Sequence, residues 1–256
     1  MADRTASVSF DRVADRYDES RGGRVRGEQH AAALEPELAA GGRTLEIGVG
    51  TGLVAAAFRQ RGRDVVGIDI SVEMLRRAHD RLGARVALAD AERLPVRTGS
   101  VDNAYAVWVF HLVRDAAAVL REAARVLRPG GRLLVVTALD QGGDTDVDEV
   151  VSRVQLRLQP ERSDHSDRLE QLGTDIGFRT GRRARVDSEP HEVTPTGYAR
   201  AVEQRLYSMY WDLDDEVWRA VVEPALAELR ALPDPDRPRQ RVVRYDILCF
   251  DWDGRP

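Results

Sequence analysis

The sequence predicts an α/β protein in which helices cover both faces of a largely parallel sheet. Short apolar runs alternate with amphipathic helical segments from Arg43 to Leu139, the pattern of a sheet buried on both faces. A glycine-rich turn follows the first apolar run, as at the ligand-binding edge of open α/β sheets. The chain has 256 residues, 43% of them hydrophobic. That is enough for one large core, or for a core with a smaller cap.

Each element of the alternating half is predicted from its own pattern. A helical stretch comes first and is interrupted by Gly22–Gly23. Ser71 is the expected N-cap of the helix that Gly83 ends. The expected elements are, in order, a helical stretch at 9–39, a strand at 43–49, a helix at 52–62, a strand at 64–70, a helix at 72–82, strands at 85–90 and 102–112, a helix at 115–127 and a strand at 132–139.

The pattern changes after Asp140. Helices are expected at 146–159 and 164–176, a strand at 183–193, two helices within 195–231 and a closing strand at 241–252. The insertion before the closing strand is long for a simple connection, so we interpret it as a cap over the site. The predicted division is an N-terminal helical segment at 1–42 that closes over the ligand, a core at 43–193 and 239–256, and a helical cap at 194–238.

Composition excludes several functions. All 38 basic residues are arginine, which excludes a Schiff-base lysine and a P-loop lysine. Cys249 is the only cysteine, which excludes disulfides within the chain and thiolate metal clusters. The formal net charge of -5 gives no reason to expect nucleic acid or an anionic membrane as a partner. Neither a membrane span nor a signal-peptide core is seen, so we expect a cytoplasmic protein.

The segment "TLEIGVGTGL" at 44–53 carries the strongest local signal. Gly48, Gly50 and Gly52 form a tight turn in which a ligand can lie against main-chain amides at a helix start. A dinucleotide fingerprint would need glycine or alanine where Leu53 stands. Glu46 would repel a pyrophosphate and suits a cationic ligand group.

Two acidic residues at strand ends extend this site. Asp69 ends the second strand, about 20 residues after the glycines, where a carboxylate can accept hydrogen bonds from both ribose hydroxyls. Asp90 ends the third strand and is placed to accept a hydrogen bond from an adenine amino group, with the Ala91 amide beside it.

The segments "LEIGVGTG", "GIDIS", "ADAERLPV", "VDNAYAVWVFHL" and "VLRPGGRLLVV" together closely resemble class I S-adenosylmethionine-dependent methyltransferases. The resemblance is greatest to the broad group related to ubiquinone/menaquinone-biosynthesis methyltransferases, and it covers roughly residues 10–140. It implies a Rossmann-like, seven-stranded mixed sheet whose last strand is antiparallel. The closing strand at 241–252 is consistent with that arrangement.

The resemblance also implies roles for individual residues in binding S-adenosyl-L-methionine. Tyr17, in "FDRVADRYDESR", falls where an aromatic side chain closes over the cofactor. The resemblance assigns Glu46, Gly48, Gly50 and Gly52 to the methionine moiety and Asp69 to the ribose. It assigns Ile70 and Met74 to the adenosine, and Asp90 and Ala91 to the adenine. Val107 lies where the fourth strand passes the cofactor.

Methyl transfer from a sulfonium is an in-line displacement that needs no metal, and alignment alone can supply ~7–11 kcal/mol. A base is needed only where the acceptor must lose a proton. His111, just after the fourth strand, is the candidate base; fixing its loop is the alternative role. His30 and His165 are further candidates for contact with the acceptor.

Aromatic residues of the insertion are candidates for the acceptor site as well. Tyr207 and Trp211, with Tyr210, could form an aromatic wall or could simply pack the helices. Arg205 beside them could pair with a carboxylate of the acceptor.

The sequence therefore predicts a small-molecule methyltransferase, monomeric or homodimeric, that acts on oxygen, nitrogen or carbon. Enzymes that methylate the amino groups of adenine or glutamine carry an Asn-Pro-Pro-Tyr-like turn after the fourth strand. This chain has "VWVF" there, so we do not expect it to act on those substrates. Two alternatives remain open. One is a non-catalytic protein that binds the adenosyl cofactor, and the other, disfavoured by Glu46 and Leu53, is an NAD-dependent oxidoreductase.

Overall fold

A computed structural model describes residues 22–138, 144–159 and 163–254, together with Phe10, Asp11, Ala14, Tyr17 and Asp18. The chain divides into two compact units. The first unit comprises Met1–Ala138, Ser163–Val186 and Tyr245–Pro256, and the second comprises Leu139–Arg162 and Asp187–Arg244.

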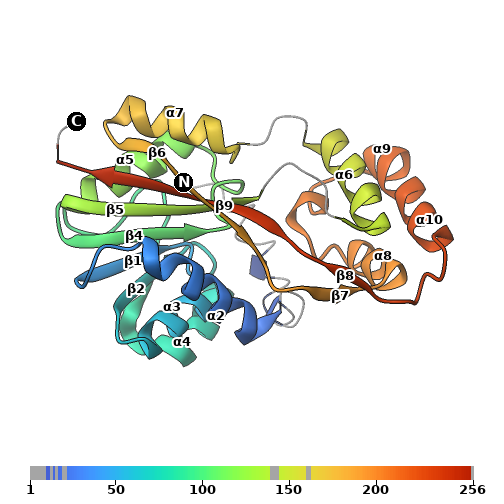
Figure 1. The fold of residues 1–256 in the computed structure, drawn as a ribbon, viewed down its shortest axis with the longest axis horizontal. Coiled ribbons are helices and arrows are strands. Elements are labelled where there is room, and N and C mark those ends of the chain that lie inside the picture. Colours follow the sequence, from blue (N-terminus) through green and yellow to red (C-terminus); the bar gives the residue numbers. More distant parts are fainter. Residues whose placement is uncertain are drawn as a thin grey trace. The chain divides into compact units, whose positions relative to one another are not determined.

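The first unit is built on a seven-stranded sheet with the order β3-β2-β1-β4-β5-β9-β6 (Figure 1). Strands β3, β2, β1, β4 and β5 pair in parallel. Strand β9 runs antiparallel to β5, with Gly131 opposite Trp252 and Ala138 opposite Tyr245. The predicted mixed sheet with an antiparallel last strand is confirmed. The strands are β1 (Arg43–Ile47), β2 (Asp64–Asp69), β3 (Val86–Leu88), β4 (Val101–Val107), β5 (Leu127–Ala138), β6 (Arg179–Asp187) and β9 (Arg244–Trp252).

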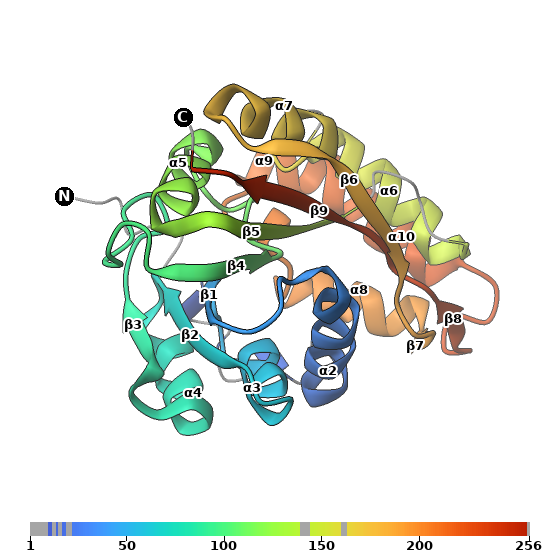
Figure 2. The same ribbon diagram turned by 60° about the vertical axis from the view of Figure 1, so that its left-hand side comes forward.

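Helices cover both faces of this sheet (Figures 1 and 2). One face carries α2 (Gly23–Leu34), α3 (Leu53–Gln60) and α4 (Val72–Leu82), and the other carries α5 (Ala116–Val126) and α7 (Ser166–Ile176). The predicted cap of α4 is confirmed, because the Ser71 hydroxyl accepts a hydrogen bond from the Met74 amide at 3.2 Å. Gly83 ends that helix with a φ of 62°. The 3₁₀ turns η1 (Glu35–Glu37) and η2 (Gly83–Arg85) follow α2 and α4.

Strand alternation divides the core of the first unit into two layers. Leu45, Ile47 and Leu133 pack with the α5 and α7 side chains, while Tyr105 and Leu134 pack with those of α2, α3 and α4. A side chain at position 46 therefore points toward the layer that contains α3.

The strand expected at 132–139 begins earlier, at Leu127, and three other predicted strands end early or are divided. The strand expected at 102–112 ends at Val107, where Trp108 adopts a φ of 59° and a turn follows. The strand expected at 183–193 is interrupted at 188–190, because Pro190 has no amide to donate. The closing strand expected at 241–252 is likewise divided, into β8 (Arg239–Arg241) and β9.

The second unit has its own core and is wider than the predicted insertion at 194–238, because it also contains 139–162, 187–193 and 239–244. The apolar stripe of α6, which includes Val147, Val150 and Val154, packs with side chains of α8 and α10. That this unit caps the site stays a prediction. Its elements are α6 (Asp146–Leu158), β7 (His191–Val193), α8 (Pro195–Glu203), η3 (Ser208–Tyr210), α9 (Asp215–Val217), the π-helical η4 (Trp218–Val222), α10 (Glu223–Ala231) and β8.

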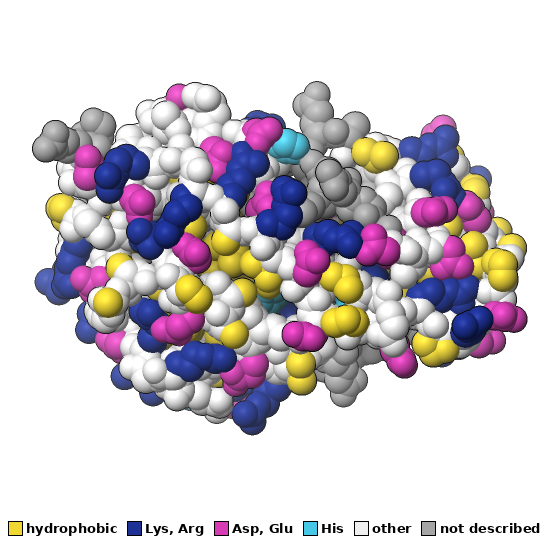
Figure 3. Space-filling model, in the orientation of Figure 1, with side chains coloured by type: hydrophobic (Ala, Val, Ile, Leu, Met, Phe, Trp, Pro, Cys, Tyr) yellow, Lys and Arg dark blue, Asp and Glu magenta, His cyan; other side chains and the backbone are white. Residues whose placement is uncertain are grey.

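The surface is rich in arginine and acidic side chains. Among the described residues on the face drawn in Figure 3, the two signs of charge are interspersed. Many arginine and acidic side chains of the described residues form exposed ion pairs, such as Arg43 with Asp64 at 3.3 Å. Pairs of this kind contribute ~0–1 kcal/mol each. Within the part of the chain that the structure describes, no helix is both long and apolar enough to span a bilayer.

Candidate functional site

The three glycines of the first turn all have positive φ angles, of 73° at Gly48, 53° at Gly50 and 81° at Gly52, which suit glycine. Their surroundings differ. A Cβ atom at Gly48 would lie 2.5 Å from Val109 Cγ2, and one at Gly52 would lie 3.0 Å from Leu82 Cδ1. A Cβ atom at Gly50 would meet no protein atom within 4 Å. Gly48 and Gly52 are thus needed for packing, whereas Gly50 leaves its main chain open to a ligand.

Asp69 is held beside Gly50 at the carboxyl end of β2. The Gly50 amide donates a hydrogen bond to Oδ2 at 2.7 Å, and the Ser71 amide donates one to Oδ1 at 2.9 Å. Burial raises the pKa of Asp69, and the two amide hydrogen bonds partly offset that shift. Each carboxylate oxygen can accept a second hydrogen bond, so this fixed group can bind ligand hydroxyls.

A single cavity in the first unit collects most of the residues predicted to bind the cofactor, at the carboxyl ends of β1, β2 and β4. They are Tyr17, Gly48, Gly50, Asp69, Ile70, Met74, Asp90, Ala91 and Val107. Ile70 is 36% exposed despite its apolar side chain.

Sequence reasoning missed other residues that line this cavity. Several belong to the turn after β4, which was expected to continue as a strand, so its side chains were not assigned to the site. The missed residues are Phe10, Ile68, Ala89, Glu92, Trp108, Val109, Leu112, Val113 and Arg114.

The lining suits an adenosyl group that carries a cationic sulfonium. Its apolar residues can contact the adenine ring, and Asp69, Asp90 and Glu92 supply three carboxyl groups. The basic residue of the lining, Arg114, lies 3.4 Å from the Asp90 carboxylate and 3.1 Å from that of Glu92. The acidic lining attracts a positive charge and the open main chain at Gly50 admits a ligand, so these residues fit the cofactor that the sequence predicts.

The described part of the N-terminal segment is attached at two points beside the cavity. The Ser71 hydroxyl donates a hydrogen bond to Asp11 at 2.5 Å, and the Thr51 hydroxyl donates one to Asp18 at 2.6 Å. Phe10 and Tyr17, whose ring centroids are 6.3 Å apart, both line the cavity.

Glu46 does not line this cavity, and its contact with the methionine moiety stays a prediction. Its side chain is 2% exposed, is absent from the cavity lining, and accepts a hydrogen bond from the Tyr105 hydroxyl at 2.9 Å. Burial raises the pKa of Glu46 to about 8, although the Tyr105 hydroxyl and the Ala55 amide oppose the shift. The side chain points toward α3 because positions 45 and 47 face the opposite layer. It accepts a hydrogen bond from the amide of Ala55 in the first turn of α3. Gly52, the N-cap of α3, is also absent from the lining.

His111 lies in the turn after β4, and its imidazole is 25% exposed. Its Nδ1 atom is 3.9 Å from Oδ2 of the buried Asp164. His111 is not part of the cavity lining, although Val109 and Leu112 on either side of it are.

His30 was expected to reach the acceptor, but it is 5% exposed and does not line the cavity. Its Nε2 atom accepts hydrogen bonds from Trp108 Nε1 at 3.1 Å and from Arg26 Nε at 3.2 Å. Burial, and then the charge of Arg26, lowers the pKa of His30 to about 3. A neutral His30 therefore supports Trp108, which does line the cavity.

His165 precedes α7, is exposed, and does not line the cavity.

Arg205, Tyr207 and Trp211 belong to the second unit and make contacts within it. Arg205 donates hydrogen bonds to the carbonyl oxygens of Tyr210 at 2.7 Å and Trp211 at 3.0 Å. Trp211 donates to the Arg205 carbonyl at 2.6 Å, and Tyr207 stacks on Tyr198 with centroids 5.2 Å apart. These contacts favour the packing interpretation of the three residues.

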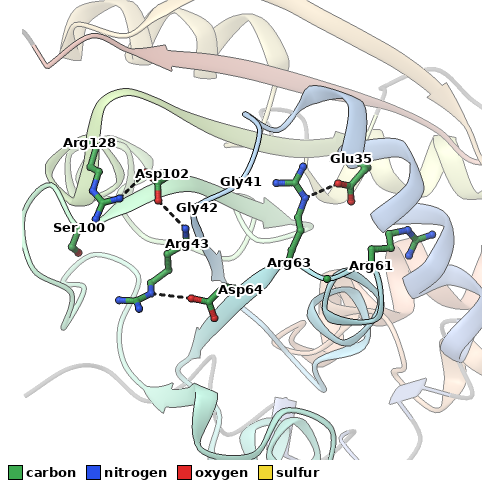
Figure 4. A pocket seen from close by; sticks show the side chains of 11 residues that line it. Glu35, Gly41, Gly42, Arg43, Arg61, Arg63, Asp64, Ser100, Asp102 and Arg128 are labelled. Atoms are coloured by element: carbon green, nitrogen blue, oxygen red, sulfur yellow. Dashed lines mark hydrogen bonds and ion pairs between the residues drawn. The ribbon is translucent and has the colours of Figure 1, made fainter.

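A larger hollow of about 640 Å³ lies at the amino ends of β1, β2 and β4, away from the glycine turn (Figure 4). Six of its charged side chains form three ion pairs with one another. The pairs are Arg43 with Asp64 at 3.3 Å, Arg128 with Asp102 at 2.7 Å and Arg63 with Glu35 at 2.6 Å. Size alone does not make this hollow the site, because open α/β sheets bind ligands at the carboxyl ends of their strands.

The sheet order, the glycine turn and the acids at the ends of β2 and β3 together define the class I, Rossmann-like methyltransferase architecture. Residues 45–135 match the family model described as "Methyltransferase domain". Over these residues the chain is similar to that family.

Curated relatives agree over the same region. The chain is 40% identical over 139 residues to a ubiquinone/menaquinone biosynthesis C-methyltransferase of Syntrophotalea carbinolica, covering 50% of this chain and 58% of that protein. It is 35% identical over 136 residues to a demethylmenaquinone methyltransferase of Mycobacterium marinum, covering 52% and 58%. The matches span less than two thirds of the length of these relatives.

Solved structures share the fold. A putative methyltransferase from Bacillus halodurans superposes with a TM-score of 0.58 at 17% identity, covering 86% of this chain and 97% of that chain. The cyclase SpnF superposes with a TM-score of 0.62 at 18% identity, covering 97% and 96%. One fold can support different reactions, so the reaction depends on the residues of the site.

Proposed function

We propose that this protein transfers a methyl group from S-adenosyl-L-methionine to a nucleophilic atom of a small molecule. The observation that carries the proposal is the open main chain at Gly50, with the Asp69 carboxylate fixed 2.7 Å from its amide nitrogen. Around that point the cavity combines apolar walls with acidic groups, in a chain similar to methyltransferases over residues 45–135.

Each part of the donor has a proposed partner in the lining. Asp69 accepts hydrogen bonds from the ribose hydroxyls, and Asp90 with the Ala91 amide binds the adenine edge. Ile70 and Met74 contact the adenosine, the glycine turn holds the methionine moiety, and Tyr17 covers the ligand. When bound, the donor supplies a methyl group already activated by its positive sulfur, so the chain need only align the acceptor with it.

The acceptor is proposed to approach from the turn after β4, where Trp108 and Leu112 line the cavity and His111 can accept a proton. The curated relatives are named for ubiquinone and menaquinone biosynthesis. Planar ring compounds are therefore the first acceptors to test, and the position methylated follows from product analysis.

The proposed donor site is tested by comparing ligand binding in variants of two aspartates of β2. We expect Asp69→Asn to weaken binding of S-adenosylhomocysteine, the demethylated product, at least tenfold, which is ~1.4 kcal/mol. Asp64→Asn at the amino end of β2 is the matched control and should bind normally. Isothermal titration calorimetry measures both. Equal affinity in the two variants would show that the donor binds elsewhere. Donor binding without methyl transfer to any acceptor would favour the non-catalytic alternative.

A further inference from the structure

Polar side chains gather at the carboxyl end of β5, on the same edge of the sheet as the glycine turn. Thr137, near the end of β5, lies opposite Asp246 of β9. The Ser166 hydroxyl lies 3.0 Å from the Thr137 hydroxyl and 3.1 Å from Asp246 Oδ2. Buried hydrogen bonds therefore fix the start of α7 against the sheet. They also restrict the position of the residues just before α7.

Asp164 is one of those residues. Its side chain is 2% exposed, and a buried carboxylate is unfavourable unless other groups stabilise its charge. The Ser163 hydroxyl donates a hydrogen bond to the Phe110 carbonyl at 3.3 Å, which ties this segment to the residue before His111. Two turns far apart in sequence thus bring His111 Nδ1 to within 3.9 Å of Asp164 Oδ2.

We propose that Asp164 is a positioning residue for His111, an inference that rests on the proposed function. It accepts a hydrogen bond from Nδ1–H, which closes to normal length when the acceptor binds, as catalytic hydrogen bonds often do. That bond fixes the neutral tautomer in which Nε2 has a free lone pair. It also stabilises the imidazolium once Nε2 has taken up a proton.

A base formed by His111 and Asp164 suits an acceptor whose nucleophilic atom carries a removable proton. A phenolic or enolic hydroxyl group is an example. In the step, the acceptor atom forms its bond to the methyl carbon while its proton moves to His111 Nε2. The electron pair of the broken carbon–sulfur bond stays on the donor's sulfur. Asp164 takes up no proton in this step, and solvent removes the proton from His111 afterwards.

The tautomer of His111 tests the proposal without any acceptor, because NMR of ¹⁵N-labelled histidine distinguishes protonated from unprotonated ring nitrogens. The protein has five histidines. The signals of His111 are identified as those that disappear in the His111→Gln variant. We expect the neutral His111 ring of the wild-type protein to be protonated mainly at Nδ1. A ring protonated mainly at Nε2 would overturn the proposal, and this measurement needs no variant of Asp164.

Removing the carboxylate gives the second measurement. Asp164→Ala should shift His111 toward the Nε2-protonated tautomer, whereas Asp167→Ala, in the exposed first turn of α7, should leave it unchanged. An unchanged tautomer in folded Asp164→Ala would contradict the proposal. Affinity for S-adenosylhomocysteine should be the same in both variants. If the wild-type protein does not bind S-adenosylhomocysteine, the proposed function itself is refuted.

An acceptor, once identified, adds a kinetic readout. Asp164→Ala should lower kcat at least tenfold with little change in KM for the acceptor, since the residue touches neither ligand. An effect confined to KM would assign Asp164 to binding and reject the positioning role.

Discussion

Glu46 places an ionisable group in the middle of a buried strand. Its pKa is about 8 in the folded protein, compared with 4.5 when the group is unperturbed. The folded state therefore keeps a proton that the unfolded state releases, and stability falls as pH rises from about 4.5 to about 8. The slope from this one group is at most ~1.4 kcal/mol per pH unit.

Glu46→Gln should remove that dependence, because glutamine can still accept the Tyr105 hydrogen bond but cannot ionise. The unfolding free energy of the variant should increase relative to the wild-type protein as pH rises from 5 to 8. Urea unfolding of both proteins at each pH measures the difference. Parallel profiles would mean that Glu46 is already ionised in the folded protein at acidic pH.

The location of residues that follow parallel strands was predictable from sequence. Asp69 ends β2 and Asp90 lies two residues after β3, so the fold alone brings both carboxylates to the cavity. Glu46 and His30 were assigned to ligands and instead are buried in hydrogen bonds with Tyr105 and Trp108. Those partners lie 59 and 78 residues away in sequence, so no local pattern could reveal them.

At the scale of elements, the second unit depends on a buried ion pair between α6 and β8. Arg241 Nε lies 2.6 Å from Asp148 Oδ1, and the Asp148 side chain is 3% exposed. The Thr145 hydroxyl also donates to Asp148 at 2.7 Å, at the start of α6. Removing the arginine leaves a buried carboxylate with its charge uncompensated, which typically costs ~3–5 kcal/mol.

Arg241→Met should therefore destabilise the second unit by about that amount. The double variant Arg241→Met, Asp148→Asn should recover part of the loss. Arg230→Met is the control, since its pair with Glu203 is exposed and should contribute less than ~1 kcal/mol. Urea unfolding followed by fluorescence of Trp211 and Trp218 measures these effects. Equal losses at Arg230 and Arg241 would show that burial of the pair is unimportant.

The sequence pattern predicts most elements of the first unit but not the residue at which β4 ends. The helices α3, α4 and α5 and the parallel strands between them follow from the alternation of amphipathic and apolar segments. The residues after Val107 are as apolar as the strand before them, so composition could not show that β4 ends there. The chain instead turns, with the Leu112 amide bonded to the Val109 carbonyl at 2.8 Å. That turn supplies part of the cavity lining.

For the molecule as a whole, a ligand that binds only the folded state should stabilise it by an amount set by its concentration. At 100 times the dissociation constant the gain is ~2.7 kcal/mol. We expect S-adenosylmethionine and S-adenosylhomocysteine to raise the unfolding temperature of the whole chain and NAD to leave it unchanged. A thermal-shift panel with the three ligands measures this. Stabilisation by NAD alone would favour an oxidoreductase.

The division into two units also shows a limit of sequence reading. An insertion before the last strand was predicted from its length, whereas residues 139–162 were assigned to the core. They join the second unit because the apolar face of α6 packs against α8 and α10. A helix that packs on a sheet and one that packs on other helices have the same periodicity.

The connectivity of the two units has an evolutionary consequence. Every described residue that lines the proposed donor cavity precedes position 115, and the second unit is formed only by 139–162 and 187–244. Exchanging those two stretches between homologues would leave intact the half that contains the proposed nucleoside site. Chimaeras of this kind would differ in their inserted segments and share the proposed site for the methyl source.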